Sequence, residues 1–252
     1  MQITSLSREE FLDLFFNKPE EFMERVDNYE AFVVRQMYPG DEIKVLRDKI
    51  FEGGLQEEPS WHPLFDGCPD YHRLHDDYPK AHVKAKMHAF YHHGYYDKNN
   101  DLFHYFSDIF HMKNTLAGYD KNKFIVNIPS SGIVSRVNCQ NYSKGGGYIA
   151  EHTDPVSEFA KIQTLIQASK FGEDFKSGGL YAREKEGAEK IYLDPHTEIG
   201  DLILLSPGII HGVEEVDPGE EYNWTRNNGK WTIFPIIIHS DYDTENKPKQ
   251  TY

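Results

Sequence analysis

Apolar residues in the first half of the chain recur with the period of amphipathic helices. Residues 11–15 place apolar side chains on one helical face, and Ser7 with Glu10 three positions later is a capping-box pattern at its start. Pro19 is favoured in the first turn of a helix, so a second helix is predicted to begin there. The other elements predicted before residue 118 are a buried strand at 31–34 and helices at 43–50 and 102–110.

After Gly118 the pattern changes to short β-prone runs separated by Gly, Pro and Asn. These runs are 124–126, 133–134, 191–193, 202–205, 209–210 and 231–238. Short strands with frequent turns are typical of an antiparallel sandwich or barrel. The sequence therefore predicts an α+β fold, in which N-terminal helices pack on a double-stranded β-helix (a jelly-roll, cupin-like core).

The length of 252 residues suits one domain. We expect residues 1–118 to form a mainly helical part with a lid, residues 119–239 the jelly-roll core, and residues 240–252 a polar tail. The lid is assigned to the stretch 53–96, which is dense in Pro, Asp, His and Tyr and has no clear periodicity.

Charge and cysteine content narrow the classes of partner and compartment. The chain has 27 Lys and Arg against 41 Asp and Glu, a net charge of −14, so we expect no nucleic-acid partner. Cys68 and Cys139 stand far apart without a CxxC companion, which favours a reducing, cytoplasmic location over a disulfide framework. Neither a signal peptide nor a long apolar run is present, so we expect no export and no membrane span.

Two histidines and one aspartate form the candidate chemical site. His152 and Asp154 are two residues apart in an extended run, so their side chains leave the same face, and His211 follows the turn at Pro207. Two imidazoles and one carboxylate suit non-haem Fe(II), because they occupy one face of an octahedral ion and leave three positions open. The alternative is a surface His-Asp pair beside an ordinary barrel-rim histidine.

The context of this motif resembles a known superfamily. The supporting segments are 177–181 (Ser-Gly-Gly-Leu-Tyr), 194–196 (Asp-Pro-His), 200–201 (Gly-Asp) and 231–232 (Trp-Thr). Together with the HxD motif, they resemble the Fe(II)/2-oxoglutarate-dependent oxygenases over roughly residues 134–238, in particular the phytanoyl-CoA hydroxylase-like and prolyl-hydroxylase-like branches.

The resemblance implies a cofactor, two cosubstrates and a reaction. Fe(II) would be held by His152, Asp154 and His211, and 2-oxoglutarate and O₂ would be consumed with release of succinate and CO₂. The implied reaction is hydroxylation of an unactivated C–H bond in a small molecule, such as an amino acid or a related metabolite. Halogenating members of the superfamily lack the carboxylate ligand, so Asp154 favours hydroxylation or a related oxidation.

The resemblance also implies a cation for the distal carboxylate of 2-oxoglutarate. Many relatives use an Arg followed two residues later by Ser on the last strand, and here Lys230 and Thr232 stand at this spacing and share a strand face. Arg226 in the preceding loop is the second candidate for the cation. Tyr142 and Asn138 alternate on an earlier strand and either hydrogen-bond a cosubstrate or substrate or simply pack in the barrel.

Two further sets of residues carry weaker hypotheses. Arg73 in the lid either clamps a substrate carboxylate or pairs with Asp70 or Asp77. His88 and His92 have a spacing that binds zinc on a helix, but they lack the Glu of a zinc-protease motif and are more simply explained as hydrogen-bonded residues.

Two other functions remain open at this stage. A cupin-type iron dioxygenase would use the same three ligands without 2-oxoglutarate. A non-catalytic jelly-roll binding module would have lost its metal. The oligomeric state cannot be predicted from this sequence.

Overall fold

The computed structural model describes residues 1–76, 81, 83–126 and 132–240. The helices are α1 (Arg8–Asn17), α2 (Pro19–Asp27), α3 (Gly40–Gly54), α4 (Asn100–Tyr105) and α5 (Ser107–Ala117), with 3-10 turns η1 (Asp97–Asn99) and η2 (Asp194–His196). The strands are β1 (Ile3–Ser7), β2 (Ala31–Arg35), β3 (Tyr71–Asp76), β4 (Ala85–His93), β5 (Ile133–Tyr142), β6 (Gly147–His152), β7 (Gln163–Gln167), β8 (Gly179–Arg183), β9 (Ile191–Tyr192), β10 (Leu202–Leu205), β11 (Ile210–Val216) and β12 (Lys230–His239).

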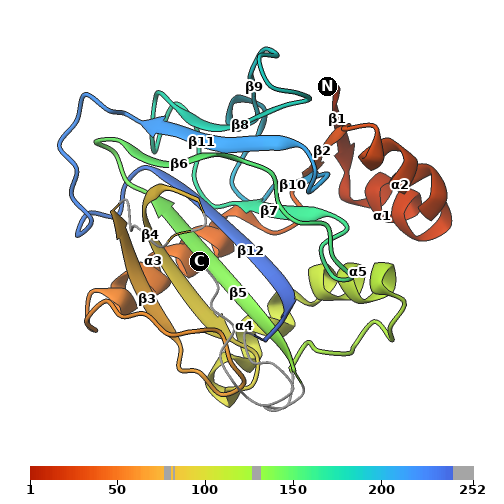
Figure 1. Cartoon of the computed structure of the whole chain (residues 1–252), viewed down its shortest axis with the longest axis horizontal. Coiled ribbons are helices and arrows are strands. Elements are labelled where there is room, and N and C mark those ends of the chain that lie inside the picture. The colour runs from red at the N-terminus through yellow and green to blue at the C-terminus, as the bar shows by residue number, and fades with distance from the viewer. Residues whose placement is uncertain (77–80, 82, 127–131, 241–252) are drawn as a thin grey trace.

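The strands form one ladder that folds back on itself. Its order is β1-β2-β10-β7-β12-β5-β4-β6-β11-β8-β9, with β3 paired to β4. The sheet bends at β4, which pairs with β5 along most of its length but with β6 at Ala85 and Lys86. The layer of β6, β11 and β8 therefore faces the layer of β7, β12 and β5 (Figure 1). This is the predicted α+β architecture with a jelly-roll core.

Two apolar cores hold these layers. The first joins the helices to the outer face of the larger layer, where Phe22, Phe110 and Trp231 are almost completely buried. The second lies between the layers, around the cavity described below, and contains Val33, Ile203 and related side chains. Alternation along a strand sends neighbours to different cores, as Phe32 and Val33 of β2 show.

Local sequence signals explain several element boundaries. The Ser7 hydroxyl accepts a hydrogen bond from the Glu10 amide at 3.2 Å, and the Glu10 carboxylate accepts one from the Ser7 amide at 2.7 Å, so the expected capping box starts α1. Helix α5 is capped by Gly118, whose φ of 83° is in the left-handed region. Pro235 is tolerated within β12 because β12 pairs with β7 only at Thr232 and Ile233.

The stretch 53–96 is a correction to the sequence analysis. Strands β3 and β4 lie within the predicted irregular lid, and only part of it, including Asp77, falls outside the described residues. Strand β4 is buried on both faces, so it lacks the polar and apolar alternation that would have revealed it. Residues 124–126 are a second correction, because they form a turn and a bend rather than a strand.

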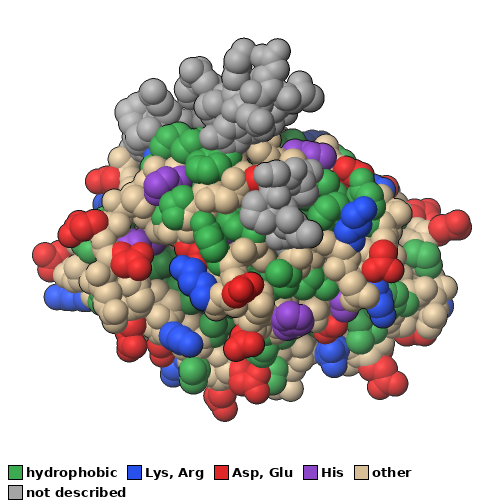
Figure 2. All heavy atoms as spheres, turned by 90° about the horizontal axis from the view of Figure 1, so that it is seen from below, with side chains coloured by type: hydrophobic (Ala, Val, Ile, Leu, Met, Phe, Trp, Pro, Cys, Tyr) green, Lys and Arg blue, Asp and Glu red, His purple; other side chains and the backbone are tan. Residues whose placement is uncertain are grey.

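Surface charge is dispersed on the face seen from below. Figure 2 shows acidic side chains over much of this face, with Lys and Arg side chains dispersed among them. Among the described residues on this face, the basic side chains do not gather into one continuous stripe. None of the described helices has both the length and the apolar character needed to cross a bilayer.

Candidate metal centre

Three side chains from two adjacent segments meet at one end of the barrel. His152 ends β6, and His211 lies directly opposite it on β11. Asp154 follows β6 in an extended loop, which is tied to the turn before β11 by a hydrogen bond of 2.9 Å from the Asp154 amide to the Pro207 carbonyl. The sequence therefore folds the HxD motif onto the strand that carries the second histidine.

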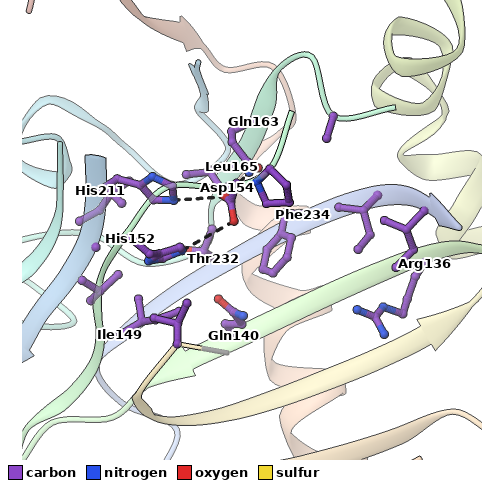
Figure 3. A pocket seen from close by; sticks show the side chains of 18 of the residues that line it. Arg136, Gln140, Ile149, His152, Asp154, Gln163, Leu165, His211, Thr232 and Phe234 are labelled. Atoms are coloured by element: carbon purple, nitrogen blue, oxygen red, sulfur yellow. Dashed lines mark hydrogen bonds and ion pairs between the residues drawn. The ribbon is translucent and has the colours of Figure 1, made fainter. Parts of the chain in front are cut away.

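The geometry of these side chains suits one metal ion. The ligand atoms of His152, Asp154 and His211 all lie within 4.8 Å of one another. The Asp154 carboxylate oxygens are 3.8 Å from Nε2 of His152 and 3.3 Å from Nε2 of His211 (Figure 3). Among the described residues, this is the one group of three or more His, Cys, Asp or Glu side chains close enough to share an ion.

Hydrogen bonds orient both imidazole rings. Nδ1 of His152 lies 2.8 Å from the Ala150 carbonyl, and Nδ1 of His211 lies 2.9 Å from the Ile209 carbonyl. Since a carbonyl only accepts, each Nδ1 carries the proton and each Nε2 keeps its lone pair. This arrangement is the usual support for a metal-ligating histidine.

Two residues beside the triad were not predicted from the sequence. The side-chain amide of Gln163, at the start of β7, donates a hydrogen bond to Oδ2 of Asp154. Lys113 of α5 also lines the cavity, and burial lowers its pKa to about 8, against the opposing effect of the Asp154 carboxylate. Neither residue belongs to a recognisable motif, because only the tertiary fold brings Gln163 to Asp154 and Lys113, whose ammonium donates to the Ile162 carbonyl at 3.2 Å, to the cavity wall.

The triad lies in a cavity of about 510 Å³ between the two layers. Its walls include Ile149, Leu165 and Phe234, so most of the surface is apolar (Figure 3). A cavity of this size and character is typical of a small-molecule site.

Polar groups from the neighbouring strands β12 and β5 line the floor beside the triad. Thr232 of β12 lies opposite Gln140 of β5, and both line the cavity. The Tyr142 hydroxyl also lies in this wall and donates a hydrogen bond of 2.6 Å to the Gln140 side-chain oxygen. Burial raises the pKa of Tyr142, so its hydroxyl stays protonated as a donor.

Lys230 has a partner that the sequence did not reveal. Its side chain is completely buried, and its ammonium group contacts the buried Asp194 carboxylate and, at 3.0 Å, the side-chain oxygen of Gln167. It lies on the Thr232 face of β12 but does not line the cavity. Its charge is thus balanced by Asp194 within the fold.

The other predicted residues are dispersed. Arg226 is exposed in the loop before β12 and does not line the cavity. Asn138 is buried opposite Phe234, and its side-chain oxygen has no hydrogen-bond partner among the described residues. Arg73 lines a neighbouring cavity together with Arg136, a residue that the sequence analysis did not single out.

The structure excludes the zinc alternative for His88 and His92, which the sequence analysis disfavoured. Both residues lie in β4, where four positions span about 13 Å, too far for a shared ion. Nε2 of His88 is instead 2.8 Å from Nδ1 of His72 on β3.

Solved structures share this architecture. A full-length protein of Neurospora crassa in complex with alpha-KG aligns with 99% of this chain and 89% of its own, at a TM-score of 0.55 and 12% identity. JOX2 in complex with 2OG, Fe and JA aligns with 98% of this chain and 81% of its own, at a TM-score of 0.50 and 12% identity. The chain has the fold of Fe(II)/2-oxoglutarate oxygenases.

A third structure with this oxygenase fold is a prolyl-4-hydroxylase from Pseudomonas putida. It aligns with 86% of this chain and 96% of its own, at a TM-score of 0.51 and 9% identity. No protein-family model matches the chain, and no curated protein matches it. The likeness therefore lies in the oxygenase fold.

Proposed function

We propose that this protein is an Fe(II)- and 2-oxoglutarate-dependent oxygenase that hydroxylates a C–H bond of a small molecule. The single observation that carries the proposal is the His152, Asp154 and His211 triad, whose two Nε2 atoms and carboxylate face one point in a largely apolar cavity. Three such ligands leave three positions for 2-oxoglutarate and O₂ on an octahedral ion. The shared oxygenase fold supports this assignment.

The protein's own residues would hold and orient the reactants. His152, His211 and Asp154 would bind Fe(II), and Gln163 would keep the Asp154 carboxylate turned towards it. When bound there, Fe(II) would supply the activation of O₂ that couples conversion of 2-oxoglutarate to succinate and CO₂ with oxidation of the substrate, one oxygen atom going to succinate and the other to the substrate.

The distal carboxylate of 2-oxoglutarate would bind to the polar floor beside the triad. We assign its hydrogen bonds to Thr232, Tyr142 and Gln140, which line the cavity there. Lys230 would not touch this carboxylate, because its ammonium is paired with Asp194. It would favour 2-oxoglutarate binding only through the electrostatic field of the Lys230–Asp194 pair. The apolar wall at Leu165 and Phe234 would exclude water from the reacting groups.

Turnover of 2-oxoglutarate tests the proposal. Purified protein given Fe(II), ascorbate, O₂ and 2-oxoglutarate is expected to release succinate and CO₂ slowly even without substrate. Asp154→Ala and His211→Ala are expected to abolish this release, while Arg8→Gln, a change in an exposed ion pair, leaves it intact. Iron binding with O₂ uptake but no succinate would instead identify a cupin-type dioxygenase, and folded protein that binds no iron would identify a binding module.

A further inference from the structure

A second cavity opens at the far end of the active-site cavity from the triad. It has a volume of about 360 Å³ and shares Arg136 and Ile238 with the first cavity. Figure 3 shows Arg136 on β5 at the opposite end of the site from His211, with Phe234 between them. Arg136 lies four residues from Gln140 along β5, about 13 Å at the rise of a strand.

Arg136 carries a charge that no carboxylate among the described residues balances. Its Nε is buried without a hydrogen-bond partner, and its guanidinium carbon lies 4.6 Å from the centre of the Tyr91 ring. The side chain as a whole is half-buried, and a cation–π contact compensates a partly desolvated guanidinium only in part. The nearby Asp70 carboxylate is already bound to His93, Lys98 and Asn99.

The surroundings of Arg136 favour an anion from outside the chain. Arg73 of β3 lines the same second cavity. Among the described residues that line either cavity, Asp154 is the one acidic side chain, and it lies at the triad. This positive end is notable in a chain with a net charge of −14, because the surface as a whole repels anions.

Aromatic rings fix the position of the guanidinium. Tyr91 of β4 pairs with Tyr71 of β3, and their ring centres are 4.6 Å apart. The Tyr91 ring in turn lies against Arg136. A guanidinium that is held in place loses little entropy when it binds a carboxylate in a two-point contact.

We propose that Arg136, assisted by Arg73, binds the carboxylate of the substrate, and that the substrate is an organic acid with an apolar body. The carboxylate would lie at the second cavity, and the body would run along Phe234, Ile236 and Ile238 towards the triad. The site of oxidation would then be remote from the carboxylate. This inference names a substrate class for the proposed function. It rests on that function for the claim that oxidation takes place at the triad.

Binding of a matched pair of probes tests the inference without iron or turnover. Octanoate and its neutral counterpart octanamide are titrated calorimetrically into metal-free protein. Wild type is expected to bind octanoate with a Kd at least tenfold lower than that for octanamide, because a charge-assisted hydrogen-bonded pair forms only with the acid. Arg136→Gln is expected to reduce this preference to threefold or less, Arg136→Lys to retain part of it, and the surface control Arg8→Gln to retain it fully.

The results separate this inference from the proposed function. A wild-type preference below threefold, or a preference that Arg136→Gln leaves unchanged, would overturn the inference even if succinate is formed. A preference that depends on Arg136 would uphold carboxylate binding even in protein without 2-oxoglutarate turnover. A tenfold rise in the KM for 2-oxoglutarate in substrate-free Arg136→Gln turnover would assign Arg136 to the cosubstrate instead and also overturn the inference.

Discussion

At the scale of single residues, the metal ligands depend on neighbours that the motif does not contain. The sequence pointed to His152, Asp154 and His211 because two of them share a strand face and the third follows a turn. It could not reveal Gln163, since a glutamine at the start of a strand is an ordinary residue until the fold places it against Asp154.

Gln163→Leu is predicted to weaken metal binding. The variant removes the hydrogen bond that holds the Asp154 carboxylate, and changes of this kind reduce metal affinity by roughly 10- to 100-fold. Anaerobic titration with Fe(II) or Co(II) measures the affinity. Gln140→Leu is the matched control, because Gln140 lies on the cavity floor and is expected to affect 2-oxoglutarate rather than the metal. Equal metal affinities in the two variants would contradict the role of Gln163.

Lys230→Met is predicted to destabilise the folded protein. The side chains of Lys230 and Asp194 are both almost fully buried, so removing the ammonium leaves an unpaired buried carboxylate at a cost of about 3–5 kcal/mol. Urea unfolding measures the loss. The double variant Lys230→Met with Asp194→Asn is expected to recover part of the stability. A single variant as stable as wild type would show that the pair contributes little to folding.

At the scale of elements, the amphipathic pattern predicted the helices and the later strands better than it predicted β3 and β4. The helices have one exposed face, so their period is visible. Strand β4 is buried on both faces and carries several histidines whose partners come from other strands, such as His72 for His88. Polar residues that are satisfied by tertiary contacts cannot be distinguished from loop residues in the sequence.

Histidines of β3 and β4 predict a loss of stability in mild acid. Burial lowers the pKa of His88 to about 3 and those of His75 and His92 to about 4. In the unfolded chain each takes up a proton near pH 6.5, so the unfolded state binds more protons and stability falls as the pH drops from about 6.5 to 4. Each histidine contributes up to about 1.4 kcal/mol per pH unit within this window.

Unfolding at several pH values checks this prediction. His88→Gln is expected to show a shallower decline in unfolding free energy between pH 6.5 and 5 than wild type. His104→Gln, a change at an exposed histidine of α4, is expected to follow the wild-type slope. A His88→Gln curve parallel to that of wild type would contradict the account of β4.

At the scale of the whole molecule, the topology decides which residues meet. The bend of the sheet at β4 brings β6 and β11 over β12 and β5, and this places the triad above Thr232 and Gln140. Sequence alternation correctly placed Lys230 and Thr232 on one face, but only the fold shows that Asp194 balances Lys230. Arg136 escaped prediction for the same reason, since only the assembled barrel shows that its buried Nε has no hydrogen-bond partner among the residues that the structure describes.

Anaerobic spectroscopy tests the central claim most directly. Fe(II) and 2-oxoglutarate are added together to the purified protein in the absence of O₂, and the visible spectrum is recorded. We predict a weak metal-to-ligand charge-transfer band that requires both additions and that Asp154→Ala loses. Folded wild-type protein that binds Fe(II) but shows no such band with saturating 2-oxoglutarate would contradict the assignment.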